Sequence, residues 1–237
     1  MKAQKKGFTL VELLVVIAIL GVLMSVFVPK IADALTATNT AAMVNKGKQI
    51  VNAIITESMS SDPVWPLAES VSGDATAQEI YVKAYGSSTE YFKALFDIQN
   101  QMSAEHKPYI NKDLIPNLWG EGVREAQPGN LTKDNIAWHI LAGADDMNTD
   151  SVPVLISRNV EVSQLPTTGE NNMSQKSEKL KFSSQYPKPF GDKACVVVLK
   201  GGSAFSLEDN KCTLKDMYKQ SPMLVVPQSA KLKYLEP

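Results

Sequence analysis

Three residues in the middle of the chain have the types and spacing of metal ligands. Asp146, Asn148 and Asp150 follow the D-x-N-x-D pattern of the first three ligands in a calcium-binding loop. The later positions of such a loop do not fit, because the sixth is Ser151 instead of glycine and the twelfth is Ser157 instead of glutamate. The pattern therefore favours a solvated turn over a calcium site, and no cofactor is expected.

The two cysteines, Cys195 and Cys212, could form a disulfide in an oxidising compartment. They flank a predicted hairpin, and a bridge between them would stabilise the fold by about 3 kcal/mol in the loop-entropy model. The alternative is a pair of buried free thiols, since Cys195 begins an apolar segment. The export that is predicted below favours the bridge.

The remaining polar residues form no catalytic motif. His106 and His139 are the only histidines, and neither has a second ligand at metal spacing. The sequence contains no G-x-S-x-G, H-E-x-x-H or C-x-x-C motif and no phosphate-binding loop. The formal net charge of −1 gives no electrostatic case for nucleic acid. We therefore expect a protein that is not an enzyme and has no nucleic-acid partner.

One carboxylate lies in a place that calls for an explanation. Glu12 is the only charged residue between Phe8 and Val28, an apolar run long enough to cross a hydrocarbon core of roughly 30 Å. A carboxylate in the bilayer is costly and is usually functional and paired. If the chain were cut between Gly7 and Phe8, a cationic α-amine would lie four residues before Glu12, on its own helix or on a neighbouring one. Glu12 is therefore interpreted as an assembly device and not as a catalytic acid.

Other interpretations of this segment explain less. A cleaved secretory signal is conceivable, because Ala32-Asp33-Ala34 matches the A-x-A cleavage pattern, but the apolar run is too long for it. A plain signal anchor explains the length and leaves Glu12 unexplained. A buried core helix does not fit, because the segment is apolar on all sides. The lysines before the run predict a cytoplasmic N-terminus and export of everything after Pro29.

The stretch KKGFTLVELLVVIAILGVL resembles the N-terminus of type IV pilins and of type II secretion pseudopilins. This resemblance implies that a prepilin peptidase cuts after Gly7 and N-methylates the new first residue, Phe8. It also implies that Glu12 acts in filament assembly. Gly21 and Pro29 match helix-weakening positions of that family, although membrane helices tolerate both residues routinely. The motif indicates a class of exported, assembled proteins and does not identify the machine.

The resemblance implies a structural subunit that catalyses nothing, and we expect a pseudopilin of a type II secretion-type filament. Its implied partners are the prepilin peptidase, other pilin or pseudopilin subunits, the inner-membrane assembly platform with its ATPase, and membrane lipid. A type IV pilus or DNA-uptake minor pilin is an alternative within this class. A membrane-anchored extracytoplasmic domain that binds a ligand is an alternative from another class. Some pseudopilins also hold calcium near the C-terminus, where the nearest acidic residues here are Glu208, Asp209 and Asp216.

The hydrophobic pattern predicts the elements that carry these residues. One helix is expected from Phe8 to about Met59, and its second half is amphipathic, with an apolar arc that includes Met43, Ile50 and Ile54. Further elements are expected by residue range: one or two helices in 74–102, irregular structure in 103–134, strands in 135–143 and 153–157, a surface loop in 163–193, a hairpin in 194–208 and an edge strand in 222–226.

The expected fold is α+β and pilin-like, with a long N-terminal helix packed on a small, mainly antiparallel C-terminal sheet. Its predicted parts are a leader (1–7), a transmembrane and assembly helix (8–29), an amphipathic continuation of that helix (30–59) and a globular domain (60–237). The expected location is the inner membrane, crossed once, with the globular domain in the periplasm or another extracytoplasmic space.

Overall fold

The computed structural model describes residues 8–60, 65–66, 84–96, 110–126, 129–144, 150–166, 169–172, 177–220, 223–226 and 232–237. By its internal contacts the chain divides into two compact units, Met1–Thr38 and Asn39–Pro237. The leader residues, His106, Asp146 and Asn148 lie outside the described residues, and so do Lys2, Lys5 and Lys6.

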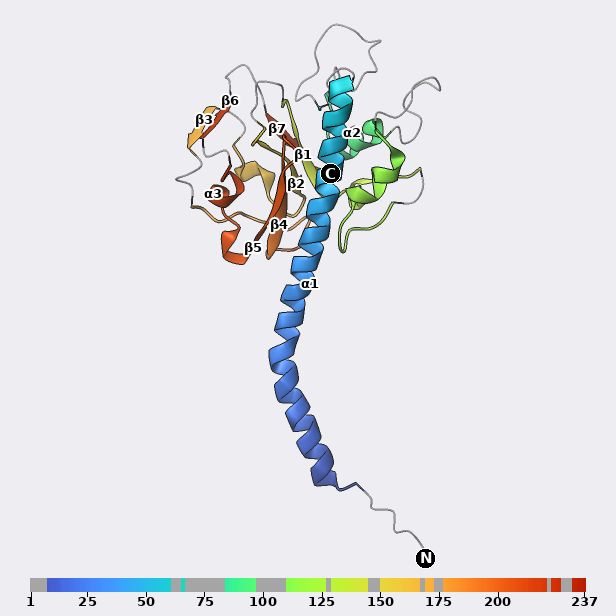
Figure 1. Ribbon diagram of the computed structural model, residues 1–237, viewed down its shortest axis with the longest axis vertical. Coiled ribbons are helices and arrows are strands. Elements are labelled where there is room, and N and C mark those ends of the chain that lie inside the picture. The colour runs from blue at the N-terminus through green and yellow to red at the C-terminus, as the bar shows by residue number, and fades with distance from the viewer. Residues whose placement is uncertain are drawn as a thin grey trace, which may run out of the picture. The chain divides into compact units, whose positions relative to one another are not determined.

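The predicted N-terminal helix is present. Helix α1 extends over Leu10–Ser60, with Pro29 inside it (Figure 1). Proline has no N–H to donate to the carbonyl of Ser25, yet the helix continues through this point. The end of α1 agrees with the predicted end at about Met59, within the usual uncertainty of helix boundaries.

The second unit contains a five-stranded antiparallel sheet, so the prediction of an α+β fold with a small C-terminal sheet is confirmed. The strands run in the order β5-β4-β2-β1-β7. The predicted hairpin is formed by the first two, with Val196 opposite Ser206 and a turn at Gly202, whose φ of 81° suits glycine. The strand bounds are β1 Trp138–Ala142, β2 Pro153–Ser157, β4 Ala194–Leu199, β5 Ala204–Glu208 and β7 Lys233–Leu235.

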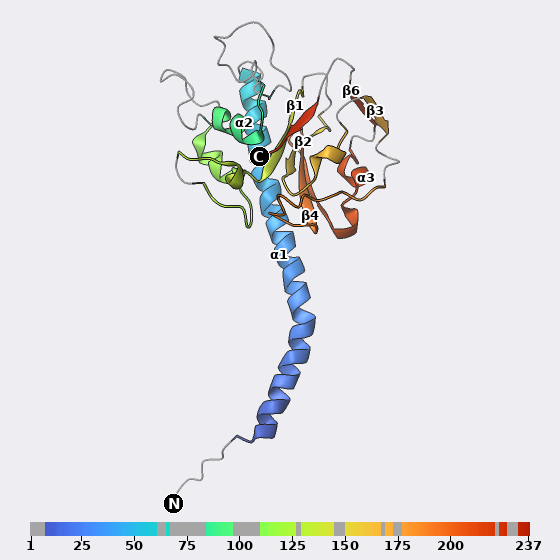
Figure 2. The ribbon, with the colours of Figure 1, turned by 180° about the vertical axis from the view of Figure 1, so that it is seen from behind.

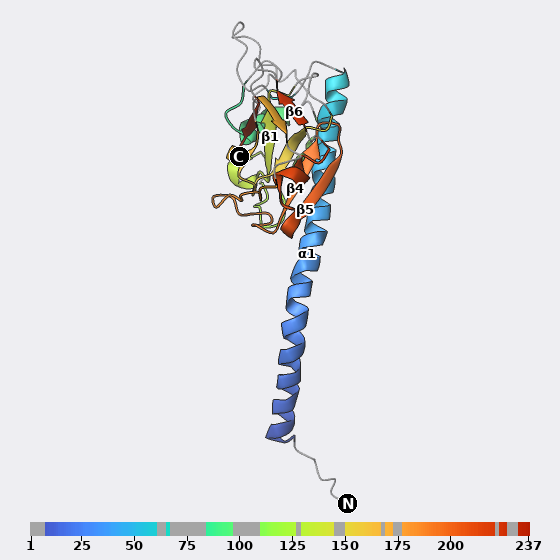
Figure 3. The ribbon, with the colours of Figure 1, turned by 90° about the vertical axis from the view of Figure 1, so that its left-hand side faces the viewer.

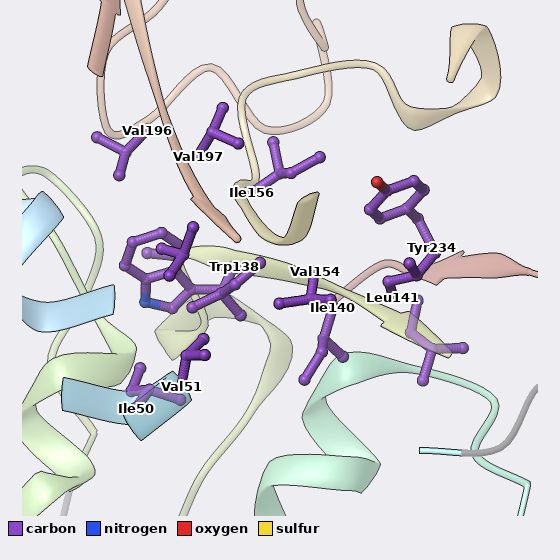
Figure 4. Packing of buried hydrophobic residues seen from close by; sticks show 14 of the residues in the cluster. Ile50, Val51, Trp138, Ile140, Leu141, Val154, Ile156, Val196, Val197 and Tyr234 are labelled. Carbon is purple, nitrogen blue, oxygen red and sulfur yellow. The ribbon is translucent and has the colours of Figure 1, made fainter. Parts of the chain in front are cut away.

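The part of α1 that belongs to the second unit packs closely on this sheet. A Cβ added to Gly47 would lie 2.6 Å from Val198 Cγ2 and 2.9 Å from Trp138 Cη2, so only glycine allows this approach. Ile50 and Val51, from α1, lie near the Trp138 indole in the core (Figure 4). Figure 3 shows β4 and β5 beside this part of the helix. The amphipathic arc predicted from the sequence is therefore the face that covers the sheet.

Smaller elements lie on the two sides of this part of α1 (Figures 1 and 2). Helix α2, Ser88–Leu95, begins at Ser87, whose side chain accepts a hydrogen bond from the Glu90 N–H. On the other side is the short helix α3, Leu214–Met217. The region 103–134, predicted to be irregular, contains 3-10 helices over Lys112–Leu118 and Lys133–Asn135.

Two expectations for the C-terminal half need correction. The predicted edge strand is β6, Met223–Val226, but it is not an edge of the main sheet. It pairs instead with β3, Gly169–Asn172, so the segment 163–193 is not wholly a loop. Strand β7 is an edge strand of the main sheet and was not predicted. Its pairing with β1 is a contact between residues far apart in the sequence, which the local sequence pattern does not show.

Candidate assembly site

The start of α1 is built around Glu12. Its Oε2 accepts hydrogen bonds from the Thr9 backbone N–H at 2.8 Å and from the Thr9 hydroxyl at 2.7 Å. In return, the Glu12 N–H donates to Thr9 Oγ1 at 3.3 Å. This reciprocal pattern is a capping box, in which Thr9 is the N-cap and Glu12 the third helical residue. The carboxylate is therefore held at the positive end of the helix dipole.

The residues after this cap give α1 an apolar surface on all sides. The side chains of Leu10 and Val11 are each at least 70% exposed, and the large apolar residues onward to Val28 are exposed as well. Phe8, just before the cap, is also exposed. One helix in the described part of the chain is long and apolar enough to cross a membrane, and its most apolar window is not buried by the protein. A core helix of a soluble protein would be covered, so this surface needs another apolar environment.

The predicted weak points of the helix lie within this surface. Gly21 has no neighbour within 4 Å of an added Cβ, so glycine is not required there by packing. Ser25 donates its hydroxyl to the Val22 carbonyl at 2.7 Å, and Pro29 follows one turn later. Of these residues, Pro29 removes one regular backbone hydrogen bond, because it has no N–H to donate to the Ser25 carbonyl.

The two cysteines are brought together, but they are not bonded in this structure. Cys195 in β4 and Cys212 after β5 are both buried free thiols. The contact between them, together with burial, raises the pKa of the Cys195 thiol. Cys212 is placed by the hydrogen bond from the Leu180 N–H to its carbonyl at 2.9 Å. The disulfide remains a prediction.

The acidic residues considered for calcium have other structural roles. Asp150 is exposed, and its carbonyl accepts from the Gly201 N–H at 2.8 Å in a turn. Glu208 accepts from the Thr40 hydroxyl at 2.9 Å, and Asp216 accepts from the Thr213 hydroxyl at the start of α3. In the described ranges, no group of three or more His, Cys, Asp and Glu side chains is arranged to hold a metal ion.

A buried polar cluster that the sequence did not indicate joins the sheet to a neighbouring loop. Arg158, which is 8% exposed, lies 5.3 Å from the ring centroid of Tyr186. Its guanidinium donates to the carbonyls of Lys133, Asp134, Ile136 and Lys188. His139 is buried beside it, and its Nε2 is 2.9 Å from the Arg158 carbonyl oxygen. Burial lowers the pKa of His139 to about 4, so the imidazole is neutral and has a structural role.

Comparison with known proteins decides the family. A family model described as the prokaryotic N-terminal methylation motif matches residues 2–28. The fimbrial protein of Neisseria meningitidis serogroup B is 32% identical over 123 residues, which cover 51% of this chain and 69% of that protein. The chain belongs to the type IV pilin family. The type IV major pilin protein PilE1 of Neisseria gonorrhoeae is also similar, with 29% identity over 71% of this chain and 75% of its own length. No solved structure matches.

Membership in this family has direct consequences. Type IV pilins are structural proteins, processed by a prepilin peptidase and assembled with other pilin subunits. The apolar α1 and the family together indicate a membrane-anchored protein with a single span. The relatives are named as pilins and as a fimbrial protein, and neither name refers to the secretion filament that was expected from the sequence.

Proposed function

We propose that this pilin is the subunit of a type IV pilus, and that its α1 is both its membrane anchor and its assembly element. The names of the relatives support a pilus over a type II secretion filament. The observation that carries the mechanism is the position of Glu12. It lies in the first turn of α1, and the large apolar residues that follow it in this helix, up to Val28, are exposed. In lipid, such a carboxylate is stabilised chiefly by a cation.

The cation in this proposal is the α-amine of Phe8, created when the prepilin peptidase cuts after Gly7 and then methylated. An amine on the same chain or on a neighbouring copy would neutralise Glu12, so cleavage enables assembly. The proposed order of parts is a leader (1–7), an anchor (8–29), a helical continuation (30–59) and a periplasmic globular domain (60–237). An inner-membrane platform and its ATPase would extract the subunit from lipid.

The test is to replace Glu12 and to follow the chain in cells that contain a type IV pilus machine. Wild-type protein should begin at methylated Phe8 by intact mass and should appear in the sheared filament fraction. Glu12→Ala should still be cleaved, but it should remain in the membrane. Glu178→Ala, which removes an exposed carboxylate of the globular domain, is the matched control and should assemble.

Two results would contradict this function. A functional chain that retains its leader would remove the proposed amine. Normal filaments from Glu12→Ala would show that the carboxylate is not needed, and the anchored ligand-binding domain would then become the better interpretation.

A further inference from the structure

Arg158 holds a positive charge inside the protein with no carboxylate bonded to it. The residue follows β2 directly and is 8% exposed. Among the residues that the structure describes, its guanidinium forms no ion pair with Asp or Glu. Burial lowers the pKa of Arg158, and the carboxylate of Asp134 offsets only a part of this effect. A buried charge without a bonded counter-ion is costly, so an anion at this position would be stabilised.

One nitrogen of the guanidinium has no protein acceptor. Nε donates to the Lys188 carbonyl at 3.1 Å. Nη1 donates to the carbonyls of Ile136, Lys133 and Asp134, at 2.8, 3.2 and 3.4 Å. Nη2 makes no hydrogen bond with a residue in the described ranges, and it is not one of the fully enclosed side-chain atoms there. Its two N–H groups are therefore accessible to a ligand from solvent.

The protein around this nitrogen is mainly basic. Two of the carbonyls that hold the guanidinium belong to Lys133 and Lys188, whose side chains are both exposed. Together with Arg158 they supply three positive charges, and Asp134, also exposed, supplies one negative charge. The guanidinium carbon lies 5.3 Å from the centroid of the Tyr186 ring, which restricts access from that side. A ligand therefore approaches the edge of the guanidinium at Nη2, next to both lysine-bearing segments.

The free donors and the surrounding charge select the kind of ligand. A cation would be repelled, and an apolar group would leave the N–H groups of Nη2 without acceptors. A phosphate group has three terminal oxygens and a charge between about −1.5 and −2 at neutral pH. It can accept from both N–H groups of Nη2 and also interact with the two lysine ammonium groups, whereas a carboxylate has two oxygens and one charge. Because only one guanidinium nitrogen is free, the site fits one phosphate group and not a chain of them.

We propose that Arg158 Nη2 and the ammonium groups of Lys133 and Lys188 bind a single phosphate group, either free phosphate or a small phosphate monoester. Arg158 then has two roles. Its Nε and Nη1 hydrogen bonds hold two segments of the second unit together, and its Nη2 anchors the ligand. The site uses no residue of α1, so it is independent of the pilus function.

The test uses the full-length chain in detergent, labelled with nitrogen-15 only in arginine. The sequence contains two arginines, Arg124 and Arg158, so NMR should show two Nε–H signals, and Arg124→Lys should remove one of them. Inorganic phosphate is added at constant ionic strength, in exchange for chloride. The Arg158 signal should shift and saturate at millimolar phosphate, while the signal of the exposed Arg124 should stay in place. A second titration with glycerol 3-phosphate distinguishes the two sources. A lower Kd than for phosphate indicates a monoester, and an equal or higher Kd indicates free phosphate.

Substitution of Arg158 would also remove its carbonyl contacts, so the variants are Lys133→Ala and Lys188→Ala, separately and together. Both keep the backbone carbonyls that hold the guanidinium. The double variant should raise the Kd for phosphate about fivefold, because exposed ion pairs are individually weak. Lys233→Ala is the matched control, since Lys233 is exposed and pairs with Ala142, at the end of β1 away from Arg158. It should bind phosphate like wild type.

Three results would overturn this site. The Arg158 signal could stay in place at the highest phosphate concentration, or both arginine signals could shift equally. The double lysine variant could also leave the Kd for phosphate unchanged. None of these results bears on filament assembly, which the Glu12→Ala experiment tests separately.

Discussion

The Thr9 hydroxyl donates to the Glu12 carboxylate at 2.7 Å, across the first turn of α1. The same carboxylate oxygen also accepts from the Thr9 backbone N–H, so Thr9 fixes where the charge lies. A carboxylate has about four acceptor positions, and Thr9 occupies two of them. The others remain available to an α-amine, so capping of the helix and pairing with Phe8 are compatible roles for Glu12.

The first prediction concerns Thr9 as the residue that positions Glu12. Thr9→Val keeps the shape of the side chain and removes the hydroxyl, so Glu12 should lose one hydrogen bond and the helix its N-cap, at about 1 kcal/mol. We expect fewer assembled subunits relative to the membrane pool, measured by quantitative blotting of sheared filaments. Thr9→Ser restores the hydroxyl and should restore assembly. Equal assembly of all three chains would contradict this role.

The capping box is visible in the sequence, because T-x-x-E before an apolar run is its signature. The sequence analysis interpreted Glu12 as an assembly device that pairs with an α-amine, and it missed the hydrogen-bond partner three residues earlier, Thr9. The helix itself was predictable, since an uninterrupted apolar run followed by an amphipathic pattern specifies it well. The hairpin of β4 and β5 was predictable for a similar reason, because a run of valines before Gly201-Gly202 favours strand and turn.

The second prediction tests the close packing of α1 on the sheet. Gly47→Ala would place a methyl group within 3 Å of both Val198 and Trp138, so side chains or backbone have to shift. Overpacking of this kind costs roughly 1–3 kcal/mol. We expect a lower midpoint for chemical unfolding of the detergent-solubilised chain, measured by the fluorescence of its tryptophans.

The matched control for this substitution lies in the same helix. A Cβ added at Gly21 meets no atom within 4 Å, so Gly21→Ala should leave the unfolding midpoint of the globular unit unchanged. If the two variants unfold at the same midpoint as wild type, Gly47 does not pack tightly against Val198 and Trp138.

The third prediction is a loss of stability in acid that depends on His139. Its pKa is about 4 in the folded protein, against about 6.5 when exposed, so protons bind more strongly to the unfolded chain. The stability contributed by neutral His139 is complete above about pH 6.5 and is lost as the pH falls towards 4. The loss amounts to about 3 kcal/mol at most, and denaturant titrations across this range measure it.

His139→Gln removes the titrating group and keeps an N–H donor. Its free energy of unfolding should therefore fall less steeply between about pH 6.5 and pH 4 than that of wild type. Identical slopes for wild type and His139→Gln would show that another group causes the acid sensitivity.

The features that the sequence did not reveal all depend on distant contacts. Arginine is a residue type that is usually exposed, so the sequence gives no reason to expect a buried Arg158. It is buried because the carbonyls of Ile136 and Lys188 accept hydrogen bonds from its guanidinium. Strand β6 likewise pairs with β3 and does not join the main sheet, and this pairing joins segments that are far apart in the sequence. Local strand propensity does not predict which distant strands will pair.

The last prediction concerns Cys195 and Cys212, whose thiols are buried against each other. In an oxidising periplasm these thiols should form a disulfide, and the mature chain should be lighter by two hydrogen atoms in intact-mass analysis. Denatured protein should then react with a thiol reagent only after reduction. Cys195→Ala combined with Cys212→Ala should lower the free energy of unfolding by about 3 kcal/mol under oxidising conditions, because the unfolded chain loses its constraint. Under reducing conditions the wild-type and double-alanine chains should differ much less. Two reactive thiols in protein taken directly from the envelope would show that the pair remains reduced and acts only in packing.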